Sequence, residues 1–164
     1  MNTLDQLREH SIVVADTADF HAIELFKPID ATTNPSLILK QAQSPVTAGL
    51  IEKTQKGLDS GRFESAAVAA LDLSVRFGVE IANRIEGYVS TEVDARLSFN
   101  TERSIEQART IIEKYQEHGI GRDRILIKLA STWEGIQAAK VIESEGIGCN
   151  LTLLFCEAQA VAAA

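Results

Sequence analysis

Four short apolar runs and one shorter strand candidate alternate with segments of helical periodicity along this chain of 164 residues. A strand followed by a helix and a further strand favours parallel pairing with right-handed crossover connections. The pattern therefore predicts an α/β protein built on a parallel sheet, either an open doubly wound sheet or part of a closed barrel. The runs with the length and composition of strands are Ser11–Ala15, Asp30–Thr33, Tyr88–Val93, Ile125–Ala130 and Cys149–Phe155.

Helices are expected between the runs. The clearest covers Thr101–His118, where apolar residues recur on one face and Gly119 supplies a stop signal. Another covers Trp133–Glu145, with Ser131 and Glu134 at the spacing of a capping box. Two more helices are expected over Val46–Leu58 and Phe63–Arg84.

The composition fits one globular domain over residues 1–164, with 45% apolar residues, 24% charged residues and a net charge of −7. The acidic balance argues against a nucleic-acid or membrane-surface partner, and no stretch is apolar enough to span a bilayer. Cys149 and Cys156 are too few for a disulfide framework, and the three histidines lie far from them. We therefore expect a cytoplasmic protein without a metal site.

Lys128 stands inside the apolar run Ile125–Ala130. Side chains alternate along a strand, so Lys128 shares a face with Leu126 and Ala130. Strands of parallel sheets are buried on both faces, and there desolvation favours a neutral amine over an ammonium ion. A neutral amine can form a Schiff base with a carbonyl substrate. The alternative is an edge-strand lysine that discourages aggregation.

A polar residue also stands at or near the carboxyl end of every expected strand. In parallel α/β sheets and barrels, ligands bind beyond these ends, so we expect a site there, and a lysine beside carboxylates supplies the groups of amine-based catalysis. The residues are Asp16, Asn34, Glu92, Lys128 and Asn150.

Each of these residues taken singly also has an ordinary structural interpretation. Asp16 could cap a helix that begins near Ala18, and Asn34 before Pro35 is typical of a helix cap. Carboxylates at Glu92 and Asp94 could be solvated loop groups opposite Arg96, and Asn150 and Thr152 could bond only to the backbone. The hypothesis of a site depends on their joint occurrence.

Five segments of the chain resemble transaldolase, the Schiff-base enzyme of the non-oxidative pentose phosphate pathway. They follow the family's order over nearly the whole chain, and they are VVADT (Val13–Thr17), DATTNPSL (Asp30–Leu37), STEVDARLS (Ser90–Ser98), ILIKLASTWEGI (Ile125–Ile136) and NLTLLF (Asn150–Phe155). The resemblance implies a (β/α)8 barrel of the class I aldolase type, of which this chain supplies about the first five βα units. It also implies sugar-phosphate substrates, a possible homodimer, and no metal or organic cofactor.

The resemblance implies a role for each matched residue. Lys128 corresponds to the Schiff-base lysine, and Asp16 to the acid/base that takes the proton of the C4 hydroxyl. Glu92 would act through a water held with Thr152, while Asn34, Asn150 and Thr32 would bind the dihydroxyacetone unit. The reaction transfers that unit from sedoheptulose 7-phosphate to glyceraldehyde 3-phosphate, giving erythrose 4-phosphate and fructose 6-phosphate.

The chain also departs from the family pattern. Cys156-Glu157 stands where the family more often has a serine and an apolar residue. A complete barrel typically needs about 250 residues, and the family's phosphate-binding serine and arginines would follow strand five. We therefore expect a shortened chain that is a poor enzyme by itself. The alternatives are a catalytically silent interaction or sugar-binding module, and a class I aldolase of the fructose-6-phosphate aldolase kind.

Overall fold

The computed structural model describes residues 2–164. Parallel strands alternate with helices, and the strand order β1-β2-β3-β4-β5 follows the chain. A doubly wound sheet would reverse its strand order at a switch point, whereas the sequential order is that of a (β/α)8 barrel. The chain clusters into two compact units that divide after Val89. The prediction of a parallel α/β fold is confirmed, and the arrangement is consistent with part of a barrel.

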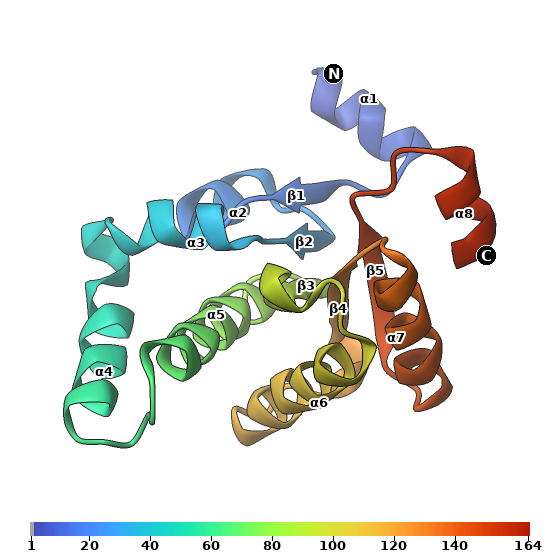
Figure 1. Cartoon of the computed structure of the whole chain (residues 1–164). Helices are drawn as coiled ribbons and strands as arrows, with labels where there is room; N and C mark the ends of the chain where they lie inside the picture. The colour runs from blue at the N-terminus through green and yellow to red at the C-terminus, as the bar shows by residue number, and fades with distance from the viewer. Residues whose placement is uncertain (1) are drawn as a thin grey trace. The chain divides into compact units, whose positions relative to one another are not determined.

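The first unit builds two short strands against a set of helices (Figure 1). Strands β1 and β2 pair in parallel, and α5 contacts α2, α3 and α4. Phe20 of α2 and Phe77 of α5 lie in this core with ring centroids 5.6 Å apart. The elements are α1 (Thr3–His10), β1 (Val14–Asp16), α2 (Phe20–Phe26), β2 (Asp30–Thr32), α3 (Pro35–Ala42), the 3-10 helix η1 (Pro45–Thr47), α4 (Ala48–Asp59) and α5 (Ala66–Ala82).

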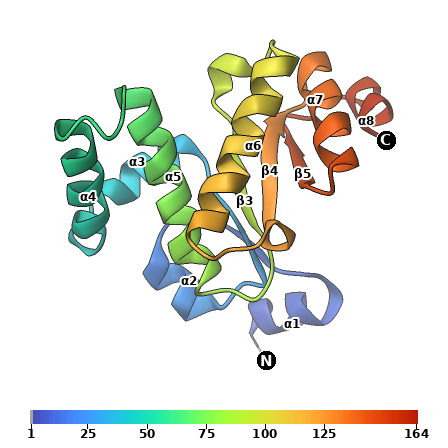
Figure 2. The same cartoon turned by 90° about the horizontal axis from the view of Figure 1, so that it is seen from below.

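The second unit places three strands beside two long helices. Helix α6 contacts α7 and β4, and α7 contacts β4 and β5 (Figure 2). The fully buried Ile127 and Ile142 belong to its core. The elements are β3 (Val89–Glu92, which starts at the last residue of the first unit), the 3-10 helix η2 (Ala95–Leu97), α6 (Thr101–Glu117), the 3-10 helix η3 (Arg122–Arg124), β4 (Ile125–Ala130), α7 (Trp133–Ser144), β5 (Gly148–Thr152) and α8 (Glu157–Ala163).

Several element bounds differ from the sequence predictions, among them β1, which begins at Val14, and α5, which covers Ala66–Ala82. Two differences at the end of the chain have a visible local cause. Strand β5 ends at Thr152 and not at Phe155, because Leu153 takes a left-handed conformation with φ of 59°. The predicted capping role of Ser131 is wrong: the cap of α7 is Thr132, whose Oγ1 accepts a hydrogen bond from the Gly135 N–H at 2.9 Å. Ser131 instead donates to the carbonyl of Thr152.

The β4–α7 connection requires a residue without a side chain at position 135. An ideal Cβ built on Gly135 would lie 2.0 Å from the carbonyl oxygen of Ala130, a backbone atom of β4. Gly49 in the first turn of α4 offers a matched contrast, because a Cβ there meets nothing within 4 Å. The same substitution should therefore have opposite effects at the two positions.

We expect Gly135→Ala to lower the free energy of unfolding by about 2 kcal/mol or more, as overpacking typically does. Gly49→Ala should raise it by about 0.4–1 kcal/mol, because alanine restricts the unfolded chain. Urea unfolding monitored by circular dichroism measures both values. A Gly135→Ala variant as stable as the parent would contradict the close packing of α7 against β4.

Candidate active site

Lys128 lies on an interior strand. Its backbone carbonyl accepts a hydrogen bond from Val93 N–H at 3.0 Å on one side, and on the other side it pairs in register with Asn150 of β5. The residue is 9% exposed. Its neighbours Ile127 and Leu129, which alternation places on the opposite face, are buried in the core. An edge-strand lysine would lack one of these flanking strands, so that alternative does not apply.

Glu92 of β3 faces the lysine amine. The distance from Lys128 Nζ to Glu92 Oε2 is 3.6 Å, and the two side chains are 11% and 17% exposed. Burial disfavours the ammonium and the carboxylate taken separately, but each charge compensates the other in a medium of low dielectric constant. The pair therefore keeps a titratable amine and a potential proton acceptor within reach of each other inside the unit.

Asn150 completes a polar row beside Lys128. Its amide nitrogen Nδ2 donates a hydrogen bond to the hydroxyl oxygen of Ser90, 3.0 Å away on β3. Ser90 and Glu92 are two residues apart on the same strand and therefore share a face. Asn150 thus contacts a side chain, and the interpretation that it bonds only to the backbone is wrong.

Thr152 is the last residue of β5, and its carbonyl accepts hydrogen bonds from the loop that connects β4 to α7. Both the backbone N–H and the hydroxyl of Ser131 donate to Thr152 O at 2.7 Å. Gln159 of α8 adds two bonds from its amide nitrogen, to Ser131 O at 2.8 Å and to Leu153 O at 3.1 Å. These bonds tie together the carboxyl ends of β4 and β5, where the candidate residues stand.

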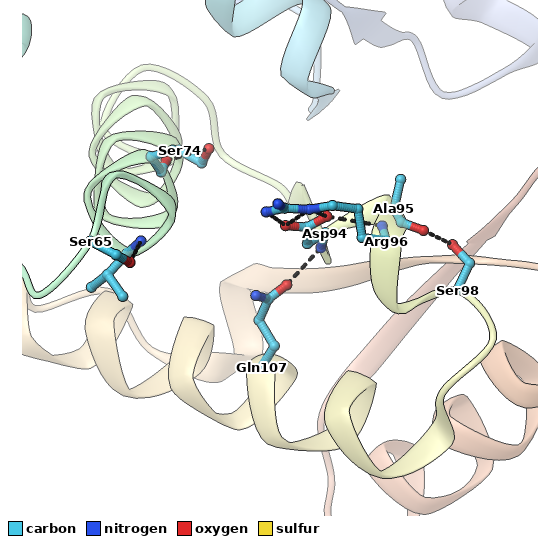
Figure 3. Close-up of polar contacts among 9 residues, drawn as sticks. Ser65, Ser74, Asp94, Ala95, Arg96, Ser98 and Gln107 are labelled. Carbon is cyan, nitrogen blue, oxygen red and sulfur yellow. Dashed lines mark hydrogen bonds and ion pairs between the residues drawn. The ribbon is translucent and has the colours of Figure 1, made fainter.

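Asp94 follows Glu92 but forms a different ion pair. Its carboxylate accepts from Arg96 Nε at 3.0 Å and from the Arg96 backbone N–H at 2.9 Å, while its own N–H donates to Gln107 Oε1 at 2.6 Å (Figure 3). The bonded Arg96 guanidinium lowers the pKa of Asp94 below its ordinary value. The sequence allowed both Glu92 and Asp94 to be loop carboxylates opposite Arg96. That interpretation is correct for Asp94 and wrong for Glu92, which faces Lys128.

Three of the predicted site residues belong to the first unit. Asp16 is exposed and pairs in register with Thr32, and the buried Oγ1 of Thr32 has no hydrogen-bond partner among residues 2–164. Asn34 caps α3, with Oδ1 accepting from Leu37 N–H at 3.0 Å. The cap of α2 is Asp19, so the interpretation of Asp16 as a helix cap is wrong.

Ser90, Ser131 and Gln159 were not singled out as functional residues by the sequence. Alternation does place Ser90 on the face of Glu92, but nothing local indicates its partner 60 residues away.

Within residues 2–164, no group of three or more His, Cys, Asp or Glu side chains could hold a metal ion. None of the helices in this described range is long and apolar enough to cross a membrane.

A buried lysine paired with a carboxylate, near the carboxyl ends of sequential parallel strands, is the arrangement expected of a class I aldolase. The model of the transaldolase/fructose-6-phosphate aldolase family matches residues 13–164. The chain belongs to this family.

Two curated relatives support the assignment. A transaldolase of Methylococcus capsulatus is 56% identical over 169 aligned positions, and one of Nostoc punctiforme is 55% identical over the same length. Each alignment covers 99% of this chain and 51% of the relative. The chain therefore spans about half the length of the curated relatives it matches.

The Asp94–Arg96 pair should make stability depend on pH. A carboxyl whose pKa is lower in the folded state than in the unfolded state stabilises the fold above the unfolded value, near 3.9 for Asp, and loses that contribution as the pH falls through the folded value. Asp94→Asn should therefore lower the urea midpoint at pH 7 and converge with the parent protein as the pH falls through the lowered pKa of Asp94. A difference that stays constant over this range would contradict the pairing.

Proposed function

We propose that the protein bearing this chain is a transaldolase. It would transfer a dihydroxyacetone unit from sedoheptulose 7-phosphate to glyceraldehyde 3-phosphate and release erythrose 4-phosphate and fructose 6-phosphate. The observation that carries the proposal is the buried Lys128 amine 3.6 Å from the Glu92 carboxylate, in a chain that belongs to this family. The names of the two relatives support transaldolase over other reactions of the same lysine.

Schiff-base formation would use residues of the second unit. Once Glu92 has taken its proton, the amine of Lys128 attacks the C2 carbonyl of the ketose and forms a carbinolamine, which loses water to give an iminium ion. The Nζ–Oε2 distance of 3.6 Å is longer than a direct hydrogen bond but within reach of proton transfer through one water. We assign that transfer to Glu92, with Thr152 holding the water, as the family resemblance implies.

Carbon–carbon cleavage would use the electron sink that the iminium ion provides. Asp16 takes the proton of the C4 hydroxyl, the C3–C4 bond breaks, and the bonding electrons move into an enamine as the aldehyde product leaves. The enamine then attacks the acceptor aldehyde, and hydrolysis frees Lys128. Asn34, Asn150 and Thr32 would bind the hydroxyls of the dihydroxyacetone unit.

The remaining proposals concern where the protein acts and with what. Sugar phosphates are its proposed small-molecule partners, and the net charge of −7 supports the view that neither nucleic acid nor a membrane surface is one. A cytoplasmic location fits the presence of only two cysteines, both of them free thiols. A homodimer is proposed on the family resemblance alone.

Trapping of the Schiff base tests the proposal directly. Incubation with fructose 6-phosphate and borohydride should add the reduced three-carbon unit to Lys128, because the iminium ion is reduced in place. Peptide mass spectrometry locates the adduct. Lys128→Met should abolish it, and Lys140→Met should keep it, since Lys140 is an exposed lysine of α7. A folded protein with no adduct on Lys128 would favour the silent binding module and refute the enzyme.

Release and transfer distinguish a transaldolase from an aldolase that uses the same lysine. With fructose 6-phosphate alone, a transaldolase should release little free dihydroxyacetone, because the enamine waits for an aldehyde. Adding erythrose 4-phosphate should raise turnover at least tenfold and give sedoheptulose 7-phosphate. Coupled assays for free dihydroxyacetone and for the seven-carbon product measure the two outcomes. Equal donor cleavage with and without the acceptor would assign the protein to the aldolases.

A further inference from the structure

We propose that Ser90 is a positioning residue of this site: its hydroxyl orients the side-chain amide of Asn150 toward the substrate. The inference deepens the proposed function and rests on it, because it takes Asn150 as a ligand of the dihydroxyacetone hydroxyls. Ser90 itself would not touch the substrate. Its effect would pass through Asn150.

The contact joins two strands that are not neighbours. Ser90 belongs to β3 and Asn150 to β5, and β4 lies between them in the strand order. The hydrogen bond of 3.0 Å from Asn150 Nδ2 to Ser90 Oγ therefore passes across one face of β4. It passes beside Lys128, which is the in-register partner of Asn150. The hydrogen-bonded side chains of Ser90 and Asn150 thus lie beside Lys128, the proposed Schiff-base lysine.

Ser90 lies deeper in the unit than the ion pair between Glu92 and Lys128. Ser90 precedes Glu92 by two residues, so it is nearer the amino end of β3, and it is only 4% exposed. The ion pair between Glu92 and Lys128 lies closer to the carboxyl end, where a substrate would enter. Ser90 therefore lies below the ion pair, while Asn150 is level with Lys128 along the sheet.

The chemistry of the Asn150 amide explains why its hydrogen bond to Ser90 matters. A side-chain amide has one end that donates and one end that accepts hydrogen bonds. When Nδ2 donates to Ser90, Oδ1 is directed elsewhere and can accept a hydrogen bond from a sugar hydroxyl. Because a hydroxyl can both donate and accept, what the serine supplies is an anchor for one end of the amide. Without that anchor the amide can turn away, so the serine holds the other end toward the substrate before the substrate binds.

Ser90→Ala tests this role in the protein that carries this chain. Loss of one oriented hydrogen bond should raise KM for fructose 6-phosphate about tenfold. Borohydride trapping on Lys128 at saturating donor should persist, because the amine is unchanged. Ser90→Thr keeps a hydroxyl and should restore KM to within about threefold of the parent. An unchanged KM in a folded Ser90→Ala protein would overturn the proposal.

Ser104→Ala is the matched control. Ser104 is as buried as Ser90, at 2% exposed, and its hydroxyl donates to Leu97 O at 3.0 Å, away from Lys128. The two variants should lose similar stability, yet only Ser90→Ala should change KM. An equal rise in KM in both variants would show a general structural effect and overturn the positioning role.

A double-mutant cycle with Asn150→Ala separates action through Asn150 from independent action. If Ser90 acts through the amide, Ser90→Ala should change kcat/KM less than twofold once Asn150 is alanine. Independent tenfold effects in both backgrounds would overturn the inference. Failure of the parent protein to trap the donor on Lys128 would refute the proposed function, and the inference with it. Normal trapping with additive effects would refute the inference alone.

Discussion

The burial of a lysine on an interior strand is the constraint on which the second unit depends. The charged form of an amine at position 128 is costly in the core unless a carboxylate compensates it, and Glu92 supplies that carboxylate from the adjacent strand. The opposite face of the same strand carries Ile125, Ile127 and Leu129, all buried in the core. One strand therefore anchors the unit on one side and presents the amine on the other.

The loops at the carboxyl ends of the strands are bonded to one another and not only to their own helices. Thr132 donates to Ser98 O and so joins the β4–α7 loop to the β3–α6 connection. Thr101 donates to Glu134 O at 3.1 Å and joins the first turns of α6 and α7. Ser131 then joins the β4–α7 loop to the end of β5. A site formed by several strands needs such links, because its side chains must keep their spacing while substrate binds and leaves.

Local pattern in the sequence predicted much of this arrangement. The run Ile125–Ala130 is a strand with the predicted bounds, and the helix at Thr101 ends one residue before the predicted His118. Alternation also placed Glu92 and Ser90 on one face. The hydrogen bond between Ser90 and Asn150 was beyond such reasoning, because it joins residues 60 positions apart across a third strand. Ser131 was assigned as a cap because local spacing favoured it, but its bond to Thr152 O comes from the neighbouring strand. Long-range pairing has no local signal.

The residues proposed for the two stages of the reaction belong to different units of the chain. The residues proposed for formation and hydrolysis of the Schiff base are Lys128, Glu92 and Thr152, all of which belong to the unit that begins at Ser90. Those proposed for carbon–carbon cleavage and for binding of the sugar hydroxyls include Asp16, Thr32 and Asn34, all in the first unit. An amine and its carboxylate partner must be buried together, because neither charge is tolerated alone. An acid/base that acts on a substrate hydroxyl needs access to that hydroxyl, and Asp16 is exposed. The different burial of the two carboxylates is thus consistent with the different protons they are proposed to move.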